Sequence, residues 1–255
     1  MIVFPTFEDG HKVRPYLFLS ENVPTAAAEE IREICAEDTE ELNDVIGLPP
    51  CRSLDAPVAS HPDMLALPIF SGGRRRLYLF ESYYNKNRGI FDSHGIIPQT
   101  VGREPDSKYP NDILLNFLIY ENHIIGRTDM MPDELKKLGL SEIYAKQGYA
   151  RCSVCLLDGG AITADAALAD ILSKLGADVL KITPGGIVLN GYGYGFIGGA
   201  TLICGKHLFF FGNPLGHPDG GKMIDFAKSH GYIPHALTGF ENSEDLFDCG
   251  GGFIF

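Results

Sequence analysis

Two copies of the tripeptide His-Pro-Asp, beginning at His61 and at His217, carry the side chains best suited to chemistry. An imidazole takes up and releases a proton near neutral pH, and a nearby carboxylate can orient the ring or hold a cationic group. We therefore predict catalytic roles for His217 and Asp219 and ligand-binding roles for His61 and Asp63. Their spacing matches no metal-binding signature, so we expect no metal and no cofactor.

Each triplet also has a structural interpretation, and the sequence leaves both open. Asp129, Asp165 and Asp219 lie 10, 11 and 12 residues before the glycines that end three predicted helices, where helix N-caps belong. Capping would explain Asp219 but leaves His217 unexplained. Asp63 enters a strand-like run instead, where a turn made by proline and aspartate is the simpler alternative.

The six cysteines lack the spacing of a disulfide framework, which favours a reducing compartment, and we expect the protein in the cytoplasm. Cys249 lies directly before three glycines and is a candidate nucleophile with a catalytic role. Cys152 and Cys155 form a CxxC pair within a strand-like run, where positions i and i+3 point to opposite faces. We therefore expect a structural role for this pair.

The stretch from Pro184 to Gly199 alternates glycine with aromatic residues, and Tyr192 and Tyr194 are candidates to line a ligand. No Lys-Ser/Thr pair follows and no strand-loop-helix pattern frames the stretch, which excludes a phosphate-binding loop. A plain connector between two structural units is the alternative. Asn213, shortly before His217, is a further ligand-binding candidate.

Two shorter motifs are interpreted as turns. Asp158-Gly159-Gly160 is expected to join two strands. Arg74-Arg75-Arg76 follows two glycines and is expected at a solvated hairpin tip. Three basic residues are too few to indicate a nucleic-acid site.

One pattern of elements recurs along the chain and would position these residues: two short strands, a helix ending at a glycine, and a third short strand. The helix-ending glycines Gly139 and Gly176 are 37 residues apart, whereas Gly176 and Gly231 are 55 apart. The 18 residues of Thr183–Ala200 account for the difference, since 55 − 18 = 37, so we interpret them as an insertion in a regular repeat. Helices are predicted over residues 25–37, 132–138, 166–175 and 220–230.

The remaining copies of the pattern lie at the ends of the chain and around residues 61–105. There, the polar segment Tyr83–Gly95 is not convincingly helical. The strand Gly252–Phe255 lacks a local partner, and pairing with Pro15–Leu19 would close a ring. We expect a single domain over 1–255 with five units, at approximately 1–60 plus 245–255, 61–105, 111–147, 151–183 and 199–240.

The composition of the 255-residue chain excludes several classes of function. Asp and Glu number 33 against 21 Lys and Arg, and the net charge of −12 argues against binding a nucleic-acid backbone. Much of the excess lies between Glu29 and Asp44, on a helix and loop expected to face solvent. No apolar run reaches the about 18–20 residues that cross a membrane. Because the amino terminus also breaks at Pro5, we expect neither a membrane partner nor a signal peptide.

Five such units closed by a terminal strand resemble the pentein fold, the five-bladed α/β propeller of arginine and agmatine deiminases, dimethylarginine hydrolases and amidinotransferases. Gly198–Gly212 is similar to a pentein strand pair that usually begins Glu-Gly-Gly-Asp, and Gly216–Asp219 to the Gly-His-x-Asp that carries the catalytic histidine. Gly250–Gly252 is similar to the glycines that precede the catalytic cysteine. Most of all, the chain resembles an uncharacterised family with this fold, and the resemblance implies a ligand site in the central cavity.

Two departures from the family pattern shape the functional expectation. Ile197 stands where the enzymes have a glutamate that engages the guanidinium, and Phe253–Phe255 occupies the place where the nucleophilic cysteine is expected. We therefore expect a pentein-fold protein that binds a small molecule in its central cavity without the usual guanidine-modifying chemistry. The alternative is a hydrolase or deiminase that acts on an amidine, guanidine or amino-acid derivative through His217 and Cys249. The sequence decides neither this question nor the oligomeric state.

Overall fold

The computed structural model describes residues 15–38, 42, 44–71 and 74–255. The expectation about the amino terminus, part of the acidic segment 29–44, and the two glycines before Arg74 lie outside the described residues.

Within the described residues, five three-stranded sheets share one strand pattern. The middle strand of each sheet pairs antiparallel with one neighbour and parallel with the other. A parallel neighbour cannot be reached by a tight hairpin and needs a crossover connection. The sheets consist of β15 (Gly252–Ile254), β1 (Tyr16–Ser20) and β2 (Asp44–Leu48); β3 (Ala66–Ser71), β4 (Arg74–Phe80) and β5 (Gln99–Val101); β6 (Leu118–Tyr120), β7 (His123–Gly126) and β8 (Ser141–Tyr144); β9 (Val154–Leu157), β10 (Gly160–Thr163) and β11 (Asp178–Lys181); and β12 (Thr201–Cys204), β13 (His207–Phe210) and β14 (Ile233–Ala236).

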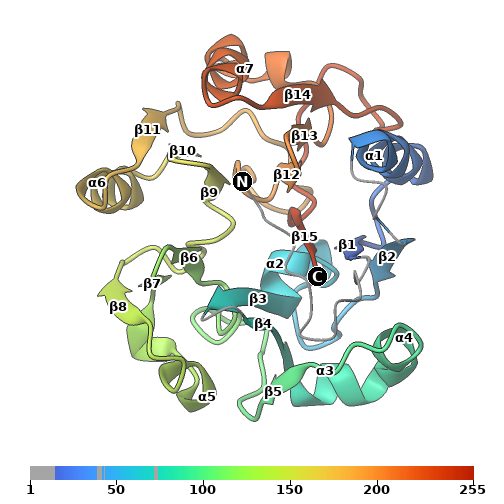
Figure 1. Ribbon diagram of the computed structural model, residues 1–255, viewed down its shortest axis with the longest axis vertical. Helices are drawn as coiled ribbons and strands as arrows, with labels where there is room; N and C mark the ends of the chain where they lie inside the picture. Colours follow the sequence, from blue (N-terminus) through green and yellow to red (C-terminus); the bar gives the residue numbers. More distant parts are fainter. Residues whose placement is uncertain (1–14, 39–41, 43, 72–73) are drawn as a thin grey trace.

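A helical segment forms the crossover in each sheet. In Figure 1 the five sheets surround a common centre, with β3, β6, β9, β12 and β15 nearest to it and the crossover helices at the periphery. Short helical turns lie at Ala56–Val58, Thr128–Met130 and Pro214–Gly216, and α2 (Pro62–Leu65) precedes β3. The crossover helices are α1 (Thr25–Asp38), α3 (Glu81–Lys86) with α4 (Arg88–Asp92), α5 (Asp133–Lys136), α6 (Ala166–Lys174) and α7 (Gly220–Ser229).

The carboxyl-terminal strand pairs with β1, the first strand of the described residues, as predicted. β15 runs antiparallel to β1, with Leu17 opposite Ile254 and Leu19 opposite Gly252. The hairpin at Asp158-Gly159-Gly160 is also confirmed, because Gly160 pairs with Leu157 across the turn.

Two local predictions are wrong. Residues 83–95 contain most of α3 and all of α4, two helices too short for an amphipathic period, each of which buries one aromatic residue, Tyr83 and Phe91. Arg74–Arg76 are not a hairpin tip but the first residues of β4, paired with β3. Their side chains remain at least partly solvent-exposed, so the start of this strand tolerates three positive charges.

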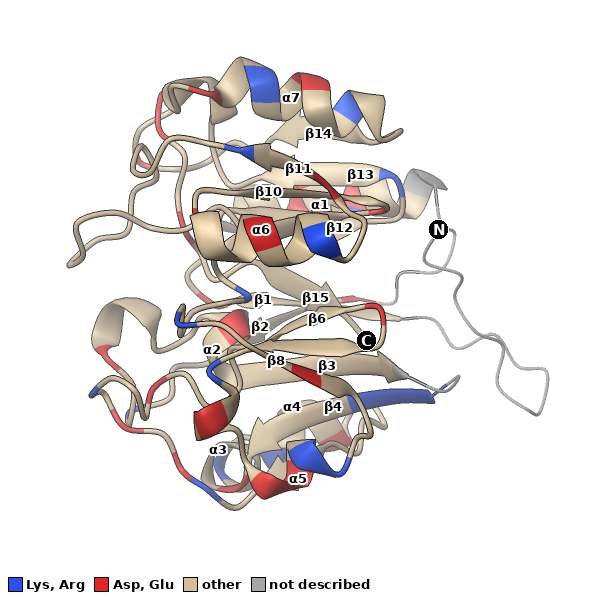
Figure 2. Ribbon diagram, turned by 90° about the vertical axis from the view of Figure 1, so that its left-hand side faces the viewer, with Lys and Arg blue, Asp and Glu red and all other residues tan. Residues whose placement is uncertain are grey.

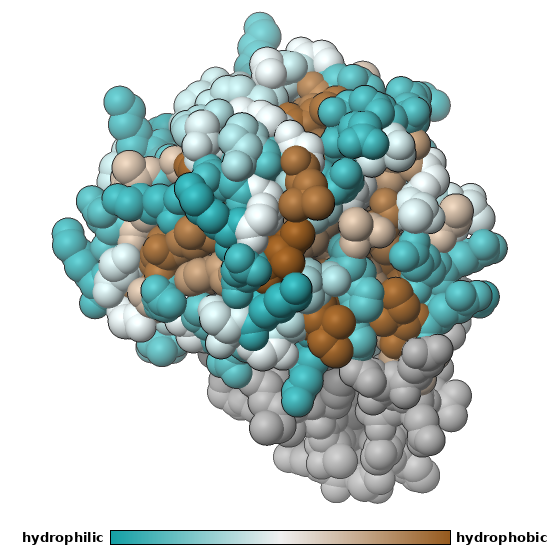
Figure 3. All heavy atoms as spheres, turned by 90° about the horizontal axis from the view of Figure 1, so that it is seen from above, coloured by the Kyte–Doolittle hydropathy of each residue, from teal (hydrophilic) through white to brown (hydrophobic). Residues whose placement is uncertain are grey.

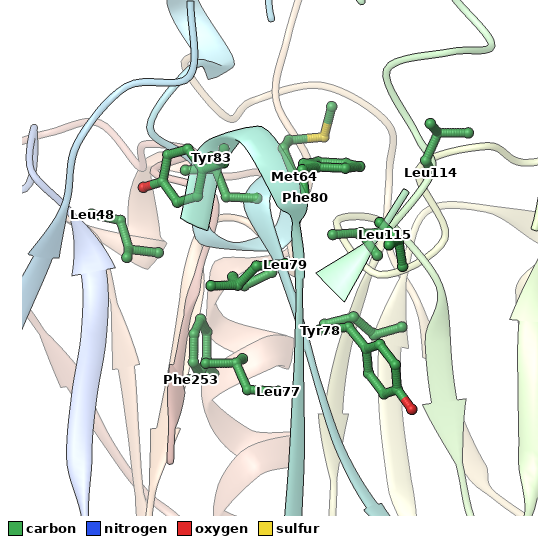
Figure 4. Close-up of a cluster of buried hydrophobic side chains, with 14 of the residues drawn as sticks. Leu48, Met64, Leu77, Tyr78, Leu79, Phe80, Tyr83, Leu114, Leu115 and Phe253 are labelled. Carbon is green, nitrogen blue, oxygen red and sulfur yellow. The ribbon is translucent and has the colours of Figure 1, made fainter. Parts of the chain in front are cut away.

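The largest apolar cluster joins the second sheet to its neighbours. Figure 4 shows Leu77, Leu79 and Phe80 of β4 close to Phe253 of β15 and Met64 of α2. Each such side chain, when fully buried, contributes roughly 1.5–3 kcal/mol to folding. Because Met64 belongs to this cluster, the short helix that carries His61 and Asp63 is fixed to the core.

Charged residues of both signs lie on the described surface. Figure 2 shows the Lys, Arg, Asp and Glu residues of both signs on the outer helices and strand ends. Figure 3, viewed from the side where α7 lies, shows small apolar groups scattered among hydrophilic residues. Among the described helices, none is long and apolar enough to cross a membrane.

Candidate functional site

Three chain segments, at residues 61–64, 149–152 and 248–250, each line two different cavities in the middle of the molecule. One cavity, the channel, has a volume of about 240 Å³ and includes Asp63 and Arg151. The other, the cleft, has a volume of about 180 Å³ and includes His61 and Asp248. The two cavities share no lining residue, so they lie on two sides of one layer of chain.

The channel is surrounded by the innermost strand of every sheet. β3, β6, β9, β12 and β15 each contribute lining residues, together with the glycines before β15. This is the arrangement seen around the centre of Figure 1.

His61 and Asp248 form a buried pair at the wall of the cleft. His61 occupies the N-cap position of α2, with Pro62 at the first helical position, so the triplet begins a short helix rather than a turn into a strand. His61 Nδ1 lies 3.7 Å from Asp248 Oδ1. Burial lowers the pKa of His61, and the Asp248 charge only partly opposes this, so the imidazole is neutral at pH 7.

The Asp248 carboxylate is held by two backbone N–H groups, one from its own segment and one from the Gly/Tyr-rich segment. Its Oδ2 accepts a hydrogen bond from Phe196 N at 2.8 Å, and its Oδ1 accepts one from Gly250 N at 2.9 Å. A β-carbon at Gly199 would lie 1.9 Å from Oδ1, so the carboxylate occupies space that only glycine leaves free. Sequence reasoning missed Asp248, because it follows three other acids, Glu241, Glu244 and Asp245, and nothing in its spacing sets it apart.

Asp63 lies on the channel side, and its backbone carbonyl accepts a hydrogen bond from a side chain. The amide group of Asn116 donates to Asp63 O at 3.1 Å and to Cys152 Sγ at 2.8 Å. No N–H or O–H group among the described residues donates to either carboxylate oxygen of Asp63, although the residue is only 2% exposed; the Cys152 thiol lies beside it. Burial and the Asp248 charge raise the pKa of Asp63 to about 7, and the Arg151 guanidinium opposes the rise. Asn116 and Arg151 were not predicted; Arg151 directly precedes the CxxC pair, which was interpreted as structural, and no motif surrounds Asn116.

The Gly/Tyr-rich segment reaches the cleft. Tyr192, Tyr194 and Phe196 line it together with Tyr149. Tyr192 Oη donates to Asp55 Oδ2 at 2.9 Å, Tyr149 Oη donates to Asp112, and the rings of Tyr149 and Phe196 stack at 5.9 Å. The segment therefore supplies an aromatic wall to the side of His61 and Asp248.

The second triplet lies apart from both cavities. His217 is buried, with Nε2 3.0 Å from Thr183 O and Nδ1 accepting from Asp219 N, so both ring nitrogens are used locally. Asp219 lies at the N-cap position of α7 but makes no capping hydrogen bond. It accepts instead from Thr183 N at 2.7 Å and from Lys222 Nζ at 2.6 Å, and these contacts lower its pKa. The structure thus does not bring His217 and His61 to one site.

The other candidate residues have different surroundings. Cys249 lines a groove of about 430 Å³ that also includes His61 and Asp248, and burial raises the pKa of its thiol well above the usual range. Asn213 accepts from Leu215 N at 2.9 Å and lines neither channel, cleft nor groove. Cys155 lies in β9 and lines the channel, whereas Cys152 lies in the turn before β9 and lines the cleft, so the prediction that both belong to one strand is wrong. In the described part of the chain, no group of three or more His, Cys, Asp or Glu side chains is placed to hold a metal ion.

A family described as "Family of unknown function (DUF6873)" matches residues 27–253, nearly the whole of the chain and all three of the segments around the cavities. The chain belongs to this family. The search of curated proteins found no match to this DUF6873 member.

Solved structures show which fold this DUF6873 member has. DDAH from Pseudomonas aeruginosa in complex with citrulline is 11% identical, with a TM-score of 0.50 over 95% of this chain and 100% of that chain. Agmatine deiminase from C. jejuni with substrate bound is also 11% identical, with a TM-score of 0.52 over 92% of each chain. Both are penteins, so the resemblance read from the sequence is confirmed: the DUF6873 member has a mixed α/β fold of five small sheets that matches pentein structures.

Proposed function

We propose that the protein binds a small cationic molecule in the cleft, with the cationic group beside Asp248 and His61 and the apolar part against Tyr149, Tyr192 and Phe196. The observation that carries this proposal is that the buried His61–Asp248 pair lines a cavity whose walls are otherwise largely aromatic and aliphatic. Ligand sites commonly combine an apolar lining with a few convergent polar groups.

The charge around the cleft supports a cation. Asp248 lies in the wall, and two further carboxylates, Asp112 and Asp55, accept hydrogen bonds from the hydroxyls of Tyr149 and Tyr192. His61 is neutral at pH 7 and leaves this negative charge uncompensated. The tyrosine rings, held by those hydrogen bonds, can also attract a cation through their faces.

The fold likeness supports the chemical class of the ligand by analogy. One of the similar structures holds citrulline, and another is an agmatine deiminase with its substrate bound. Fold similarity at this level of identity does not carry a function over by itself. It does make amidines, guanidines and amino-acid derivatives the first compounds to test.

We give second place to a hydrolase or deiminase that uses His217 and Cys249. His217 lines neither the cleft nor the groove, and both of its ring nitrogens have local partners. Burial and Asp248 raise the pKa of Cys249, which keeps the thiol protonated, whereas nucleophilic attack requires the thiolate. These two features favour binding over covalent catalysis.

We propose further that the chain is a single domain, residues 1–255, in which the five sheets are the blades of one closed propeller. Support comes from the β15–β1 pairing, which joins the two ends of the chain. We also keep the proposal of a cytoplasmic protein without a nucleic-acid or membrane partner. Cys51, Cys152, Cys155, Cys204 and Cys249 are free, as a reducing compartment would leave them.

Benzamidine and agmatine are the probes that test the cleft. Each carries an amidinium or guanidinium group and no carboxylate, and we expect either to raise the melting temperature of the wild-type protein, because a ligand of the folded state stabilises it. The stabilisation should be lost in Asp248→Asn, which removes the charge. In Tyr192→Leu, which removes part of the aromatic wall, the apparent affinity for each probe should fall at least several-fold.

Tyr144→Leu is the matched control. Tyr144 is 56% exposed at the end of β8 and lines neither cavity, so its replacement should leave the ligand response intact. If neither probe stabilises the protein, or if the response survives in both Asp248→Asn and Tyr192→Leu, the cleft is not the site.

A further inference from the structure

The channel contains a buried carboxylate without a strong hydrogen-bond donor. Both oxygens of Asp63 are buried, and no N–H or O–H group among the described residues donates to either; the Cys152 thiol, a weak donor, lies beside the carboxylate. Leaving an ionised carboxylate unpaired in a protein interior is costly, and native proteins normally compensate such a group. Asp63 is among the residues that line the channel, and because its carboxylate oxygens have almost no accessible surface, a ligand that pairs with it requires the side chain to turn toward the cavity.

The same cavity contains a guanidinium with unused donors. Arg151 Nη1 donates to Ala66 O at 2.5 Å, and its guanidinium lies 5.7 Å from the ring centre of Phe253. Of the five N–H donors of an arginine, this is the single one with an acceptor among the described residues. Asp63 and Arg151 influence each other electrostatically but are not hydrogen-bonded.

The space between these groups suits a small molecule. The channel volume of about 240 Å³ exceeds by several-fold the roughly 30 Å³ that one water occupies in the liquid. Its remaining walls come from strand residues such as Leu67, Val154 and Leu202, and from Gly198 and Gly251, which add no side chains. Besides Asp63 and Arg151, the lining includes the polar side chains of Thr201 and Cys155, and the cavity contains one negative and one positive group.

We propose that the channel is a second binding site, for a small zwitterion whose ammonium group pairs with Asp63 and whose carboxylate pairs with Arg151. A simple cation would be repelled by Arg151, and a simple anion by Asp63. An apolar ligand would leave both charges unpaired, which is the costly arrangement. A molecule with both charges, such as a small amino acid, satisfies both. This site shares no lining residue with the cleft, so it does not depend on the function proposed above.

L-Alanine and two of its derivatives test the proposal on the wild-type protein. L-Alanine carries both charges, its methyl ester lacks the carboxylate, and N-acetylalanine lacks the ammonium group. At concentrations well above its dissociation constant, alanine should raise the melting temperature by roughly 5 °C, whereas both derivatives should leave it unchanged. No stabilisation by alanine, or equal stabilisation by either derivative, would overturn the proposal.

Variants assign the site and separate it from the cleft. Asp63→Asn and Arg151→Met should each abolish the alanine response, while Tyr192→Leu should retain it and lose only part of the benzamidine response. If Asp63→Asn folds, as judged by circular dichroism, and still responds fully to alanine, the channel is not the site. If a variant does not fold, the comparison of alanine with its two derivatives on the wild type still decides the proposal.

Discussion

Gly250 lies directly against His61: a β-carbon at Gly250 would stand 2.3 Å from the β-carbon of His61. The φ angle of Gly250 is 75°, a left-handed value that residues with a side chain rarely adopt. Its N–H donates to Asp248, and its carbonyl accepts from Asp63 N at 3.2 Å. One glycine therefore sets the spacing of the three side chains that separate the channel from the cleft.

Gly250→Ala should destabilise the protein and displace His61. Gly139→Ala is the matched control, because Gly139 has a φ of 74° and nothing within 4 Å of an added β-carbon. The control should lose roughly 1–2 kcal/mol for the left-handed conformation alone. Gly250→Ala should lose clearly more in urea unfolding, because the clash with His61 is added. Equal losses in the two variants would show that His61 moves away at no cost.

Asp165→Ala should cost about 1 kcal/mol of stability, the usual value of an N-cap. Asp165 Oδ1 accepts from Leu168 N at 2.9 Å at the start of α6. Asp170→Ala, on the exposed face of the same helix, should be neutral or slightly stabilising, since alanine is the better helix former. Urea unfolding measures both, and a cost at Asp170 equal to that at Asp165 would argue against a specific cap.

The local elements could be predicted because the signals that define them are local. Gly139, Gly176 and Gly231 all have positive φ, so the repeat that they indicated once residues 183–200 were counted as an insertion marked real ends of helical segments. Asp165 caps its helix as its position predicted. Asp219, at the equivalent place before α7, instead accepts hydrogen bonds from the backbone N–H of Thr183, which lies 36 residues earlier in the chain, and from the side chain of Lys222.

The site could be predicted only in part, because its contacts join residues far apart in the chain. His61 was found through the His-Pro-Asp tripeptide and Tyr192 through the glycine- and aromatic-rich composition of its segment, and both line the cleft. Asn116 contacts Asp63 across 53 positions and Cys152 across 36, and no spacing rule covers such distances. We also predicted His61 and Asp63 in one cavity. In the short helix that they begin, His61 lines the cleft and Asp63 lines the channel.

Cys249 should react slowly with iodoacetamide at neutral pH. Burial, with the Asp248 charge next to it, raises the pKa of this thiol, so little thiolate is present at pH 7. The alkylation rate, followed by mass spectrometry with Cys249→Ser to identify the site, should keep rising up to at least pH 9. Fast labelling that levels off below pH 8 would contradict this and would favour the enzymatic alternative.

Asp63 should make the stability depend on pH between about 4 and 7. The pKa of Asp63 is raised from 3.8 to about 7, so the folded protein binds this proton more tightly than the unfolded chain does. The stability that the proton contributes is complete below pH 4 and is lost as the pH rises through 7. At 1.36 kcal/mol per pKa unit, the loss is at most about 4 kcal/mol.

The comparison with Asp63→Asn isolates this effect, because the variant cannot lose the proton. Urea unfolding at intervals from pH 4 to pH 8 should show the variant becoming more stable relative to wild type as the pH rises, with most of the change between pH 5 and pH 7. Asp170→Asn, which removes an exposed carboxylate, controls for the change in net charge. A difference between wild type and Asp63→Asn that stays constant over this range would mean that Asp63 is already ionised at pH 5, held by compensation from Arg151.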